Sequence, residues 1–404
     1  MAKEKAWHLR VWRVLDFLEK AGAAARESRG RERSKRALTV LECESMVSGD
    51  SCTRVRNTLG MRRKGFAAPI SIKDIAKMAD VSHSTVSRAL RHSPLINEHT
   101  AAKIRRIAED SGYRASAVAR SLVTRQTRTV GIVVTSIADP FAGGVVSGIE
   151  DAANDRGFSV ILANSNADPD REIRVVRAFE ERRVDGIIVT SSRAGAVYTP
   201  MIEQMRLPIV LLNNQHPSEF VHSVMIANID ASREATEYLI ELGHRRIAYL
   251  GDRFGGQSDS ERFAGYRRAL EAADVMFRPE LMVHGDGKPE GGIRAMAQLL
   301  ALREPPTAVF CYNDMTALGA LRQIRAQGLR VPQDISLIGF DDLYIAQYTD
   351  PPLTTVRQPM RLMGRMAMET LLHLLTGSDS VQSVKVPGEL IIRESTAAPN
   401  GERL

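Results

Sequence analysis

A run of small polar and basic side chains between residues 82 and 88 could bind DNA. The run consists of Ser82, His83, Ser84, Thr85, Ser87 and Arg88. Arginine can form a bidentate pair with guanine in the major groove, whereas Ser and Thr hydroxyls often bind phosphate oxygens. We expect the first three residues and Arg88 to reach base edges, and Thr85 and Ser87 to contact phosphates. Alternatively, Arg88 is a solvated surface arginine, and His83 contacts a phosphate or caps its own helix.

A second group of polar residues follows short apolar runs later in the chain. These residues are Thr135-Ser136, Asn164-Ser165, Thr190-Ser191-Ser192, Asn213-Asn214, Asn313-Asp314 and Asp341-Asp342. Asn, Asp and Ser are also common turn and helix-capping residues, so any single position has a purely structural explanation. Taken together, the positions predict a polar cleft at the carboxyl ends of several strands.

The elements that would present the first group form a helix-turn-helix. Residues 72–79 carry apolar side chains at helical spacing. Asp80 ends this helix, because Asp adopts the left-handed turn conformation more readily than most residues. Ser82 can cap a second helix, which is the one that enters a major groove. Residues 100–111 predict a third helix that packs against the first two.

The elements that would present the second group are strands alternating with helices. The apolar runs are residues 130–134, 160–163, 186–189, 209–212, 247–250, 281–283, 308–310 and 336–339. Helical patterns, such as residues 144–154 and 170–182, lie between them. Such runs are typical of parallel strands buried on both faces. Two sets of four runs, separated by a linking segment around residues 223–229, predict two doubly wound α/β lobes around a shared cleft.

These motifs resemble those of the LacI/GalR family of bacterial transcription regulators. DIAKMADVSHSTVSRAL resembles the family's DNA-binding signature, and AVARSL at residues 117–122 resembles its hinge helix. DPFAGGVVSGIE, ERFAGYRRAL, YNDMTALGAL, ISLIGFDD and PPLTTVRQP resemble its effector domain in the same order. The resemblance covers residues 70–396. It implies an all-α helix-turn-helix headpiece with a hinge helix, joined to an α/β two-lobed effector domain of the periplasmic-binding-protein fold.

The resemblance also implies which residues set the operator sequence. Positions 83, 84 and 88 would determine the sequence preference. Leu122 matches the hinge leucine that the family inserts into the minor groove, and Ala119 matches the small residue beside it. The family's usual proline and asparagine are replaced by Ala115 and Ser116. Because the restriction that proline places on the backbone is absent, we expect the hinge helix to form less readily.

The motifs carry over a set of residues that would bind a small effector. The set is Phe141, Thr190, Asn213, Arg262, Asn313 and Asp341. Its arginine, amide and carboxylate suit vicinal hydroxyls, and Phe141 could stack on a ring. A single fixed cation favours a neutral sugar over a multiply phosphorylated ligand. An aromatic content of 5% disfavours a purine-like corepressor. Alternatively, Arg262 and Asp341 pair with each other as a structural ion pair.

The charge is distributed unevenly along the chain. The net charge of +7 is the sum of +8 in residues 1–68, +6 in residues 69–128 and −7 in residues 129–404. A basic front followed by an acidic remainder predicts a polyanionic partner, such as double-stranded DNA, for the front only.

Composition and motifs disfavour other classes of protein. No apolar run approaches the ~18–20 residues of a membrane span, and charges interrupt residues 7–18, so we expect a cytoplasmic, nucleoid-associated protein. Cys43, Cys52 and Cys311 have no disulfide or zinc spacing. No catalytic or phosphate-loop motif is present, so we expect no enzyme, cofactor or metal site.

Two alternatives from other classes remain. A sugar-processing α/β enzyme could use Asp314 and Asp341 as acid–base carboxylates. A solute-binding protein would share the two lobes, but it would need a signal peptide and would lack the helix-turn-helix.

The sequence therefore predicts four parts. They are an N-terminal extension (1–69), a helix-turn-helix domain (70–114), a hinge helix and linker (115–128) and a two-lobed effector-binding and dimerisation domain (129–404). The extension is disordered or results from an upstream start, since Met61 offers another start; the rival is a basic phosphate-binding arm. No heptad zipper follows the strand-like residues 383–395, so we expect a homodimer on a pseudo-palindromic operator.

Overall fold

The computed structural model describes residues 70–113, 126–192, 205, 207–213, 222–377 and 383–400. The expectations for the N-terminal extension and for the hinge residues Ala119 and Leu122 lie outside this part of the chain. The chain divides into two units, Met1–Tyr113 and Arg114–Leu404, which are taken in turn.

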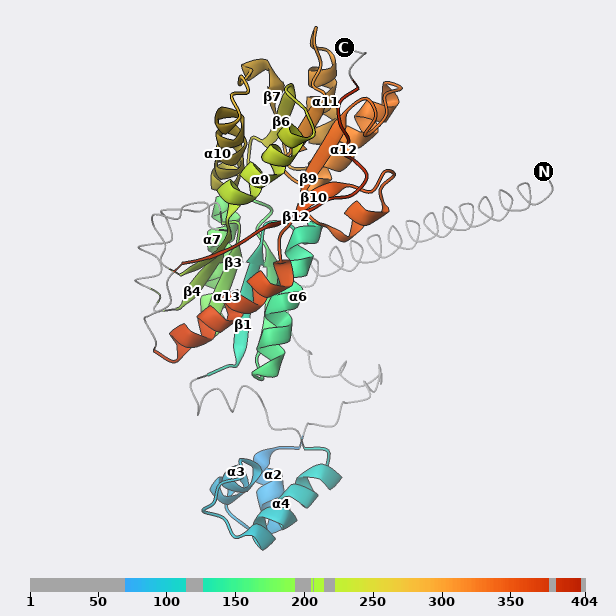
Figure 1. Ribbon diagram of the computed structural model, residues 1–404. Helices are drawn as coiled ribbons and strands as arrows, with labels where there is room; N and C mark the ends of the chain where they lie inside the picture. The colour runs from blue at the N-terminus through green and yellow to red at the C-terminus, as the bar shows by residue number, and fades with distance from the viewer. Residues whose placement is uncertain are drawn as a thin grey trace, which may run out of the picture. The chain divides into compact units, whose positions relative to one another are not determined.

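The described part of the first unit contains three helices around a small apolar core (Figure 1). They are α2 (Ile72–Ala79), α3 (His83–Leu90) and α4 (Glu98–Asp110). Ile75, Val86 and Ile104, one from each helix, are fully buried. Asp80 has φ of 57°, which confirms the predicted left-handed turn. Helix α4 begins two residues earlier than predicted, because the side chain of Asn97 accepts a hydrogen bond from the backbone of His99.

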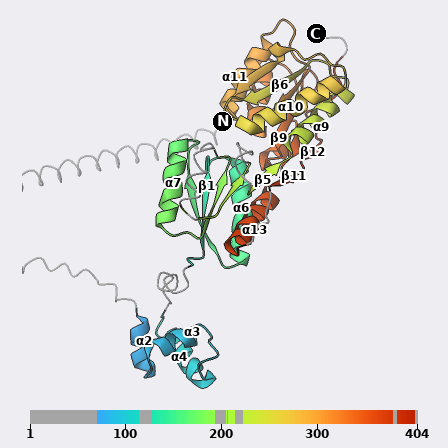
Figure 2. The same ribbon diagram turned by 90° about the vertical axis from the view of Figure 1, so that its left-hand side faces the viewer.

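The N-terminal lobe of the second unit is built on a six-stranded sheet. In spatial order its strands are β11 (Val384–Val386), β5 (Ser223–Ile226), β4 (Ile209–Leu212), β3 (Gly186–Thr190), β1 (Thr129–Val134) and β2 (Ser159–Asn164). All neighbouring strands are parallel. Helix α7 (Pro169–Glu181) covers one face, and α6 (Pro140–Asp155) and α13 (Met360–Leu375) cover the other (Figure 2). Successive side chains of β1 pack on opposite faces, as the two-residue period of a strand requires.

The C-terminal lobe repeats this plan with a second six-stranded sheet. Its strands are β12 (Glu389–Ile391), β10 (Thr354–Arg357), β9 (Ser336–Asp341), β8 (Ala308–Cys311), β6 (Ile247–Asp252) and β7 (Met282–Gly285). Only the pairing of β12 with β10 is antiparallel within this sheet of the described structure. Helices α9 (Asn228–Glu241) and α10 (Gly256–Ala272) pack on one face, and α11 (Pro289–Leu300) and α12 (Asp314–Ala326) on the other. The predicted pair of doubly wound α/β lobes is confirmed.

The number of strands per lobe was wrong, because short polar strands escaped the hydropathy pattern. Residues 223–229, predicted as a linking segment, contain β5 and the start of α9, and the chain passes from one lobe to the other between these two elements. The buried Ser223 hydroxyl lies 2.7 Å from that of Ser383, and the buried Thr355 hydroxyl of β10 donates to Asp314. Each hydroxyl has a partner, so these strands can be buried despite their polarity.

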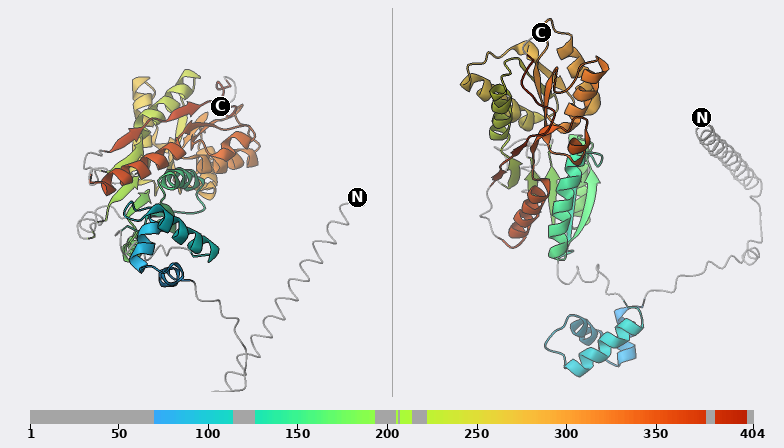
Figure 3. Two further views of the ribbon diagram at one scale, coloured as in Figure 1. Left: turned by 90° about the horizontal axis from the view of Figure 1, so that it is seen from below. Right: turned by 45° about the vertical axis from the view of Figure 1, so that its right-hand side comes forward.

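The chain passes between the two sheets three times, between β5 and α9, between β10 and α13 and between β11 and β12. The strand-like residues 383–395 therefore form two strands in different sheets rather than one. Helix α13, drawn red, returns from the C-terminal lobe and lies beside α6 (Figures 1 and 3).

Helices α6 and α13 cross closely because glycines stand at the contact. A Cβ on Gly148 would lie 2.1 Å from the carbonyl oxygen of Arg361, and one on Gly364 would lie 2.1 Å from that of Val145. The nearest atoms to either added Cβ belong to the backbone of the other helix, so no flexible side chain could move aside.

We predict that Gly148→Ala lowers the free energy of unfolding by about 1–3 kcal/mol, the usual cost of overpacking. The matched control is Gly143→Ala in the same helix, where an added Cβ meets no atom within 4 Å. There the better helix propensity of alanine should stabilise by about 0.5–1 kcal/mol. Urea unfolding measures both changes, and equal effects at the two sites would contradict the close crossing.

A buried histidine joins the C-terminal lobe to the last described residues. His244 is 1% exposed, its Nε2 donates to the carbonyl oxygen of Ala397 at 2.9 Å, and its Nδ1 lies 2.9 Å from the Thr307 hydroxyl. Burial lowers the pKa of this imidazole below its usual value of about 6.5, although the bond to Ala397 opposes the shift.

The depressed pKa of His244 predicts a loss of stability in acid. The unfolded chain takes up a proton as the pH falls below about 6.5, whereas the folded chain resists it, so protonation favours unfolding. The free energy of unfolding should therefore fall from pH 7 to pH 5 by less in His244→Gln than in the parent chain. His373→Gln, at an exposed position on α13, should keep the parent slope. Parallel slopes in urea unfolding of all three proteins would disprove this account.

Candidate functional site

The run of polar residues predicted to bind DNA occupies one exposed face of α3. Ser82, the N-cap, is exposed together with His83, Ser84 and Arg88, whereas Thr85 and Ser87 are half-buried. The opposite face of the helix carries Val86 and Ala89 into the core. The four exposed residues are those predicted to reach base edges, and the two half-buried residues are those predicted to contact phosphates, so these contacts stay predictions.

Hydrogen bonds organise the hydroxyls at the start of α3. The Ser82 Oγ accepts from the backbone N–H of Thr85 at 3.1 Å, which confirms the predicted cap. The same oxygen lies 2.8 Å from the hydroxyls of Ser84 and Thr85. At the other end, Arg91 donates from Nε to the carbonyl oxygen of Ser87 at 3.1 Å and from Nη2 to the Ser87 hydroxyl. Arg91 was not predicted to bind DNA, but it places a cation beside Ser87, a predicted phosphate contact.

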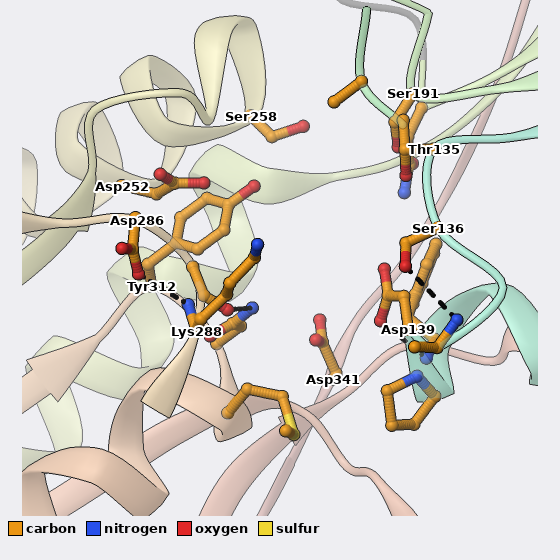
Figure 4. A pocket seen from close by; sticks show the side chains of 18 of the residues that line it. Thr135, Ser136, Asp139, Ser191, Asp252, Ser258, Asp286, Lys288, Tyr312 and Asp341 are labelled. Atoms are coloured by element: carbon orange, nitrogen blue, oxygen red, sulfur yellow. Dashed lines mark hydrogen bonds between the residues drawn. The ribbon is translucent and has the colours of Figure 1, made fainter. Parts of the chain in front are cut away.

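Loops from both lobes of the second unit enclose a cavity of about 600 Å³ (Figure 4). Its lining includes Phe141, Asn213, Arg262, Asn313 and Asp341, which are five of the six residues expected to bind an effector. The sixth, Thr190, does not line it: its buried hydroxyl donates to the carbonyl oxygen of Val133 at 3.3 Å. The neighbouring Ser191 faces the cavity instead.

Arg262 is held rigidly although it is charged. Its Nε donates to the side-chain oxygen of Asn228 at 2.9 Å, and its Nη1 donates to the backbone carbonyl of Tyr312 at 2.5 Å. The guanidinium carbon lies 3.7 Å from the ring centroid of Phe340 and 4.6 Å from that of Tyr312. Within the described structure no ion pair joins Arg262 to Asp341, so the alternative of a structural pair between them is wrong.

Asp341 is a buried carboxylate at the end of β9. Its φ of 117° lies in a region that only glycine adopts readily, and its side chain lines the cavity (Figure 4). Its Oδ1 accepts from the Gln358 Nε2 at 2.6 Å. Burial, opposed by Arg262 and reinforced by the nearby Asp139, raises the pKa of Asp341 to about 7.

The two residues after β8 have structural partners. The side-chain oxygen of Asn313 accepts a hydrogen bond from the backbone N–H of Thr316 at 2.8 Å and so caps α12. The side-chain nitrogen of Asn313 donates to the carbonyl oxygen of Gly287, which also lines the cavity, at 3.1 Å. Asp314 is fully buried, accepts from the backbone of Leu343 at 2.7 Å and does not line the cavity. The pair of acid–base carboxylates that an enzyme would need is therefore not present at Asp314 and Asp341.

Several lining residues were missed. They include Asp139, Asp252, Asp286, Lys288, Glu290, Tyr312 and Gln358. Asp139 and Tyr312 are the first residues of the motifs DPFAGGVVSGIE and YNDMTALGAL, but only Phe141 and Asn313 were selected from these motifs. Asp286, Lys288 and Glu290 follow β7, and none of the polar positions predicted to form the cleft lies after this strand.

Across the ranges that the structure describes, no group of His, Cys, Asp and Glu side chains could hold a metal ion. Nor does any helix there combine the length and hydropathy that a bilayer span requires.

Comparison with protein families places two known domains on the chain. Residues 71–116 match the family described as bacterial regulatory proteins, lacI family. Residues 236–396 match the periplasmic binding protein-like domain.

The most similar relatives include transcriptional repressors. CytR of Escherichia coli strain K12 is 36% identical over 341 residues, which cover 84% of this chain and 99% of the relative. PurR of Vibrio atlanticus strain LGP32 is 34% identical over 327 residues, covering 81% and 98%.

Solved structures agree with this placement. The lac repressor dimer bound to operator and an anti-inducer matches with a TM-score of 0.76 and 28% identity, covering 82% of this chain and all of that one. The regulator CelR in complex with cellobiose matches with a TM-score of 0.62 and 33% identity, covering 81% and 99%. A ribose-bound regulator from Enterococcus faecium matches with a TM-score of 0.61 and 26% identity, covering 67% and 100%.

Proposed function

Because this chain belongs to the lacI family of bacterial regulatory proteins, we propose that it is a homodimeric repressor released from, or recruited to, its operator by a neutral, hydroxyl-rich ligand. That it is a DNA-binding transcription regulator under ligand control, rather than an enzyme, follows from the family. The class of ligand, the residues that bind it and the assembly are the proposed parts.

The charge of the cavity is the observation that carries the class of ligand. Its described lining holds five acidic side chains, Asp139, Asp252, Asp286, Glu290 and Asp341, against two basic ones, Arg262 and Lys288. The Arg262 guanidinium already donates to two protein oxygens. A phosphorylated ligand would therefore meet an excess of negative charge, whereas hydroxyls can donate to carboxylates and accept from Asn and Arg. The cellobiose and ribose complexes of related structures agree with this class.

A nucleoside is the second candidate, because two aromatic rings reach the cavity. Phe141 and Tyr312 both line it. The low aromatic content of the whole chain was thus a poor guide to the composition of the site. A ribose would satisfy the polar groups, and a base could stack on a ring.

Exposed apolar side chains support a second copy of the chain as partner. Strand β2 is the free edge of its sheet, and its Ile161 and Leu162 are 38% and 40% exposed. In the C-terminal lobe, Tyr344, Ile345 and Tyr348 are exposed on the 3-10 helix that follows β9. Exposed edges and apolar patches commonly mark interfaces. Sedimentation should show that Leu162→Asp with Tyr348→Asp weakens the dimer, whereas Met276→Asp, at another exposed apolar position, does not.

Two measurements test the proposed function. The intact chain should retain specific genomic fragments that share a pseudo-palindromic sequence, and retention of random fragments only would refute it. Thermal unfolding should then be followed with ribose, cellobiose, cytidine, adenosine and glucose 6-phosphate. Stabilisation by ribose or cellobiose, with a change in operator affinity, would support a sugar as the ligand. The same response to cytidine or adenosine would select the nucleoside. A response to glucose 6-phosphate alone would overturn both proposals.

A further inference from the structure

Two carboxylates from opposite lobes point into the same cavity (Figure 4). Asp139 belongs to the N-terminal lobe, where it caps α6 and its Oδ1 accepts from the backbone of Phe141 at 3.1 Å. Asp341 belongs to the C-terminal lobe and ends β9. Both are acceptors, and any movement that closes the lobes brings their negative charges together.

Neither carboxylate is compensated by an ion pair within the described structure. The adjacent Asp342 differs, because it forms ion pairs with Arg357 at 2.7 Å and with Arg393 at 2.5 Å. Burial raises the pKa of Asp139, and burial with repulsion from Asp139 raises that of Asp341 despite the opposing charge of Arg262. Two like charges at one site favour retention of a proton.

The neighbouring groups do not remove this repulsion. The ionisable or charged groups around Asp341 are Arg262 on α10, Tyr312 after β8, Asp314 at the start of α12, Asp342 beside it and Asp139 from the opposite lobe. Asp314 has its own pKa raised by burial and by Asp341, so it adds no positive charge. Arg262 is the only cation among these groups that acts on Asp341, and the two hydrogen bonds that the structure gives its guanidinium go to Asn228 and Tyr312.

We propose that Asp139 and Asp341 share one proton across the cleft, so that closure of the lobes, and with it the binding of a neutral effector, is coupled to proton uptake. The inference rests on the proposed function only in taking this cavity as the effector site. A shared proton replaces repulsion by a hydrogen bond, directly or through a ligand hydroxyl. Closure is then favoured below neutral pH and disfavoured above it.

Gln358 suits both protonation states. Its Nε2 donates to Asp341, and its buried Oε1 has no hydrogen-bond partner among the described residues. An amide turned about its last bond would present that oxygen to a protonated Asp341, since an amide can donate to a carboxylate or accept from a carboxylic acid. The site therefore keeps its hydrogen bond whether or not the proton is present.

The first test measures proton linkage in the ligand-free, full-length protein. A carboxyl that keeps a proton when folded makes the folded chain less stable as the pH rises. Compared with Asp341→Asn, the unfolding constant of the parent should increase by up to about tenfold per pH unit between pH 5 and pH 7, the limit for one proton. Asp139→Asn should reduce this dependence, and Asp274→Asn, away from the cavity, should not. A parent profile parallel to that of Asp341→Asn would overturn the proposal.

The second test measures closure itself. Spin labels are placed at Glu180→Cys on α7 and Gln298→Cys on α11, both exposed, in a chain with Cys43 and Cys52 replaced by Ser. Cys311 is buried and stays. Labelled protein is diluted with unlabelled protein, and the distance distribution is recorded at pH 6 and pH 8. The distances should be shorter at pH 6 in the parent and independent of pH in Asp139→Asn. Superimposable parent distributions, or an unchanged pH effect in Asp139→Asn, would overturn the coupling while leaving operator binding intact.

Discussion

Replacing Arg88 with alanine should sharply reduce discrimination between operator and random DNA while leaving the headpiece folded. Arg88 is exposed on α3 and its removal uncovers no core residue, since Val86 and Ala89 fill the opposite face. A bidentate pair with guanine contributes about 1–3 kcal/mol of discrimination per recognition helix. A dimer carries two recognition helices, so the free energy of discrimination should fall by twice this amount. Fluorescence anisotropy with operator and scrambled duplexes at one salt concentration measures it.

The control for Arg88 is another arginine of the same headpiece. Arg106 on α4 is exposed and forms only a long ion pair, 3.9 Å, with Asp110 within the described structure. Arg106→Ala removes the same charge, so it should weaken binding to both duplexes by a similar factor. An equal loss of discrimination in the two variants would show that Arg88 contributes charge alone, as a solvated surface arginine would.

Replacing Arg262 with methionine should destabilise the effector domain and abolish the response to ligand together. Methionine fills a similar volume but leaves the oxygens of Asn228 and Tyr312 without their donors. Arg262 is 3% exposed, so water cannot replace those bonds. Losing buried bonds to a charged group costs about 2–4 kcal/mol. Urea unfolding measures the cost, and operator titration with and without ligand measures the response.

Arg268 on the same helix is the matched control. It is exposed and does not line the cavity, so Arg268→Met should change neither quantity appreciably. If Arg262→Met kept the ligand response at a temperature where it is folded, Arg262 would serve stability only, and the effector would be bound by the remaining lining residues.

The sequence predicted best where the signal is local. The headpiece was predicted almost to the residue, because Asp80 and Ser82 fix the turn through their own side chains. The long apolar strands of both lobes were also found. Strands β5 and β10 were missed, since partners far away in sequence, Ser383 and Asp314, make their buried hydroxyls acceptable.

Only some of the residues that line the cavity were predicted, because their orientation also depends on parts of the chain that are distant in sequence. Arg262 and Asp341 lie within quoted motifs, and Asn213 follows an apolar run. Whether a side chain after a strand faces the cavity depends, however, on the register of the strand end. Thr190 and Ser191 are neighbours, and only Ser191 faces the cavity. The meeting of Asp139 with Asp341 is a property of two lobes and could not be read from either motif alone.

The three passages between the sheets have a consequence for how the protein is made. The N-terminal lobe takes α13 and β11 from the last part of the chain, and the C-terminal lobe takes β12. A growing chain therefore cannot complete the N-terminal lobe before residue 386 has been synthesised, or the C-terminal lobe before residue 391. The core of the headpiece is complete at Tyr113, which packs against its three helices. During synthesis a DNA-binding module precedes, by more than half the length of the chain, the domain that regulates it.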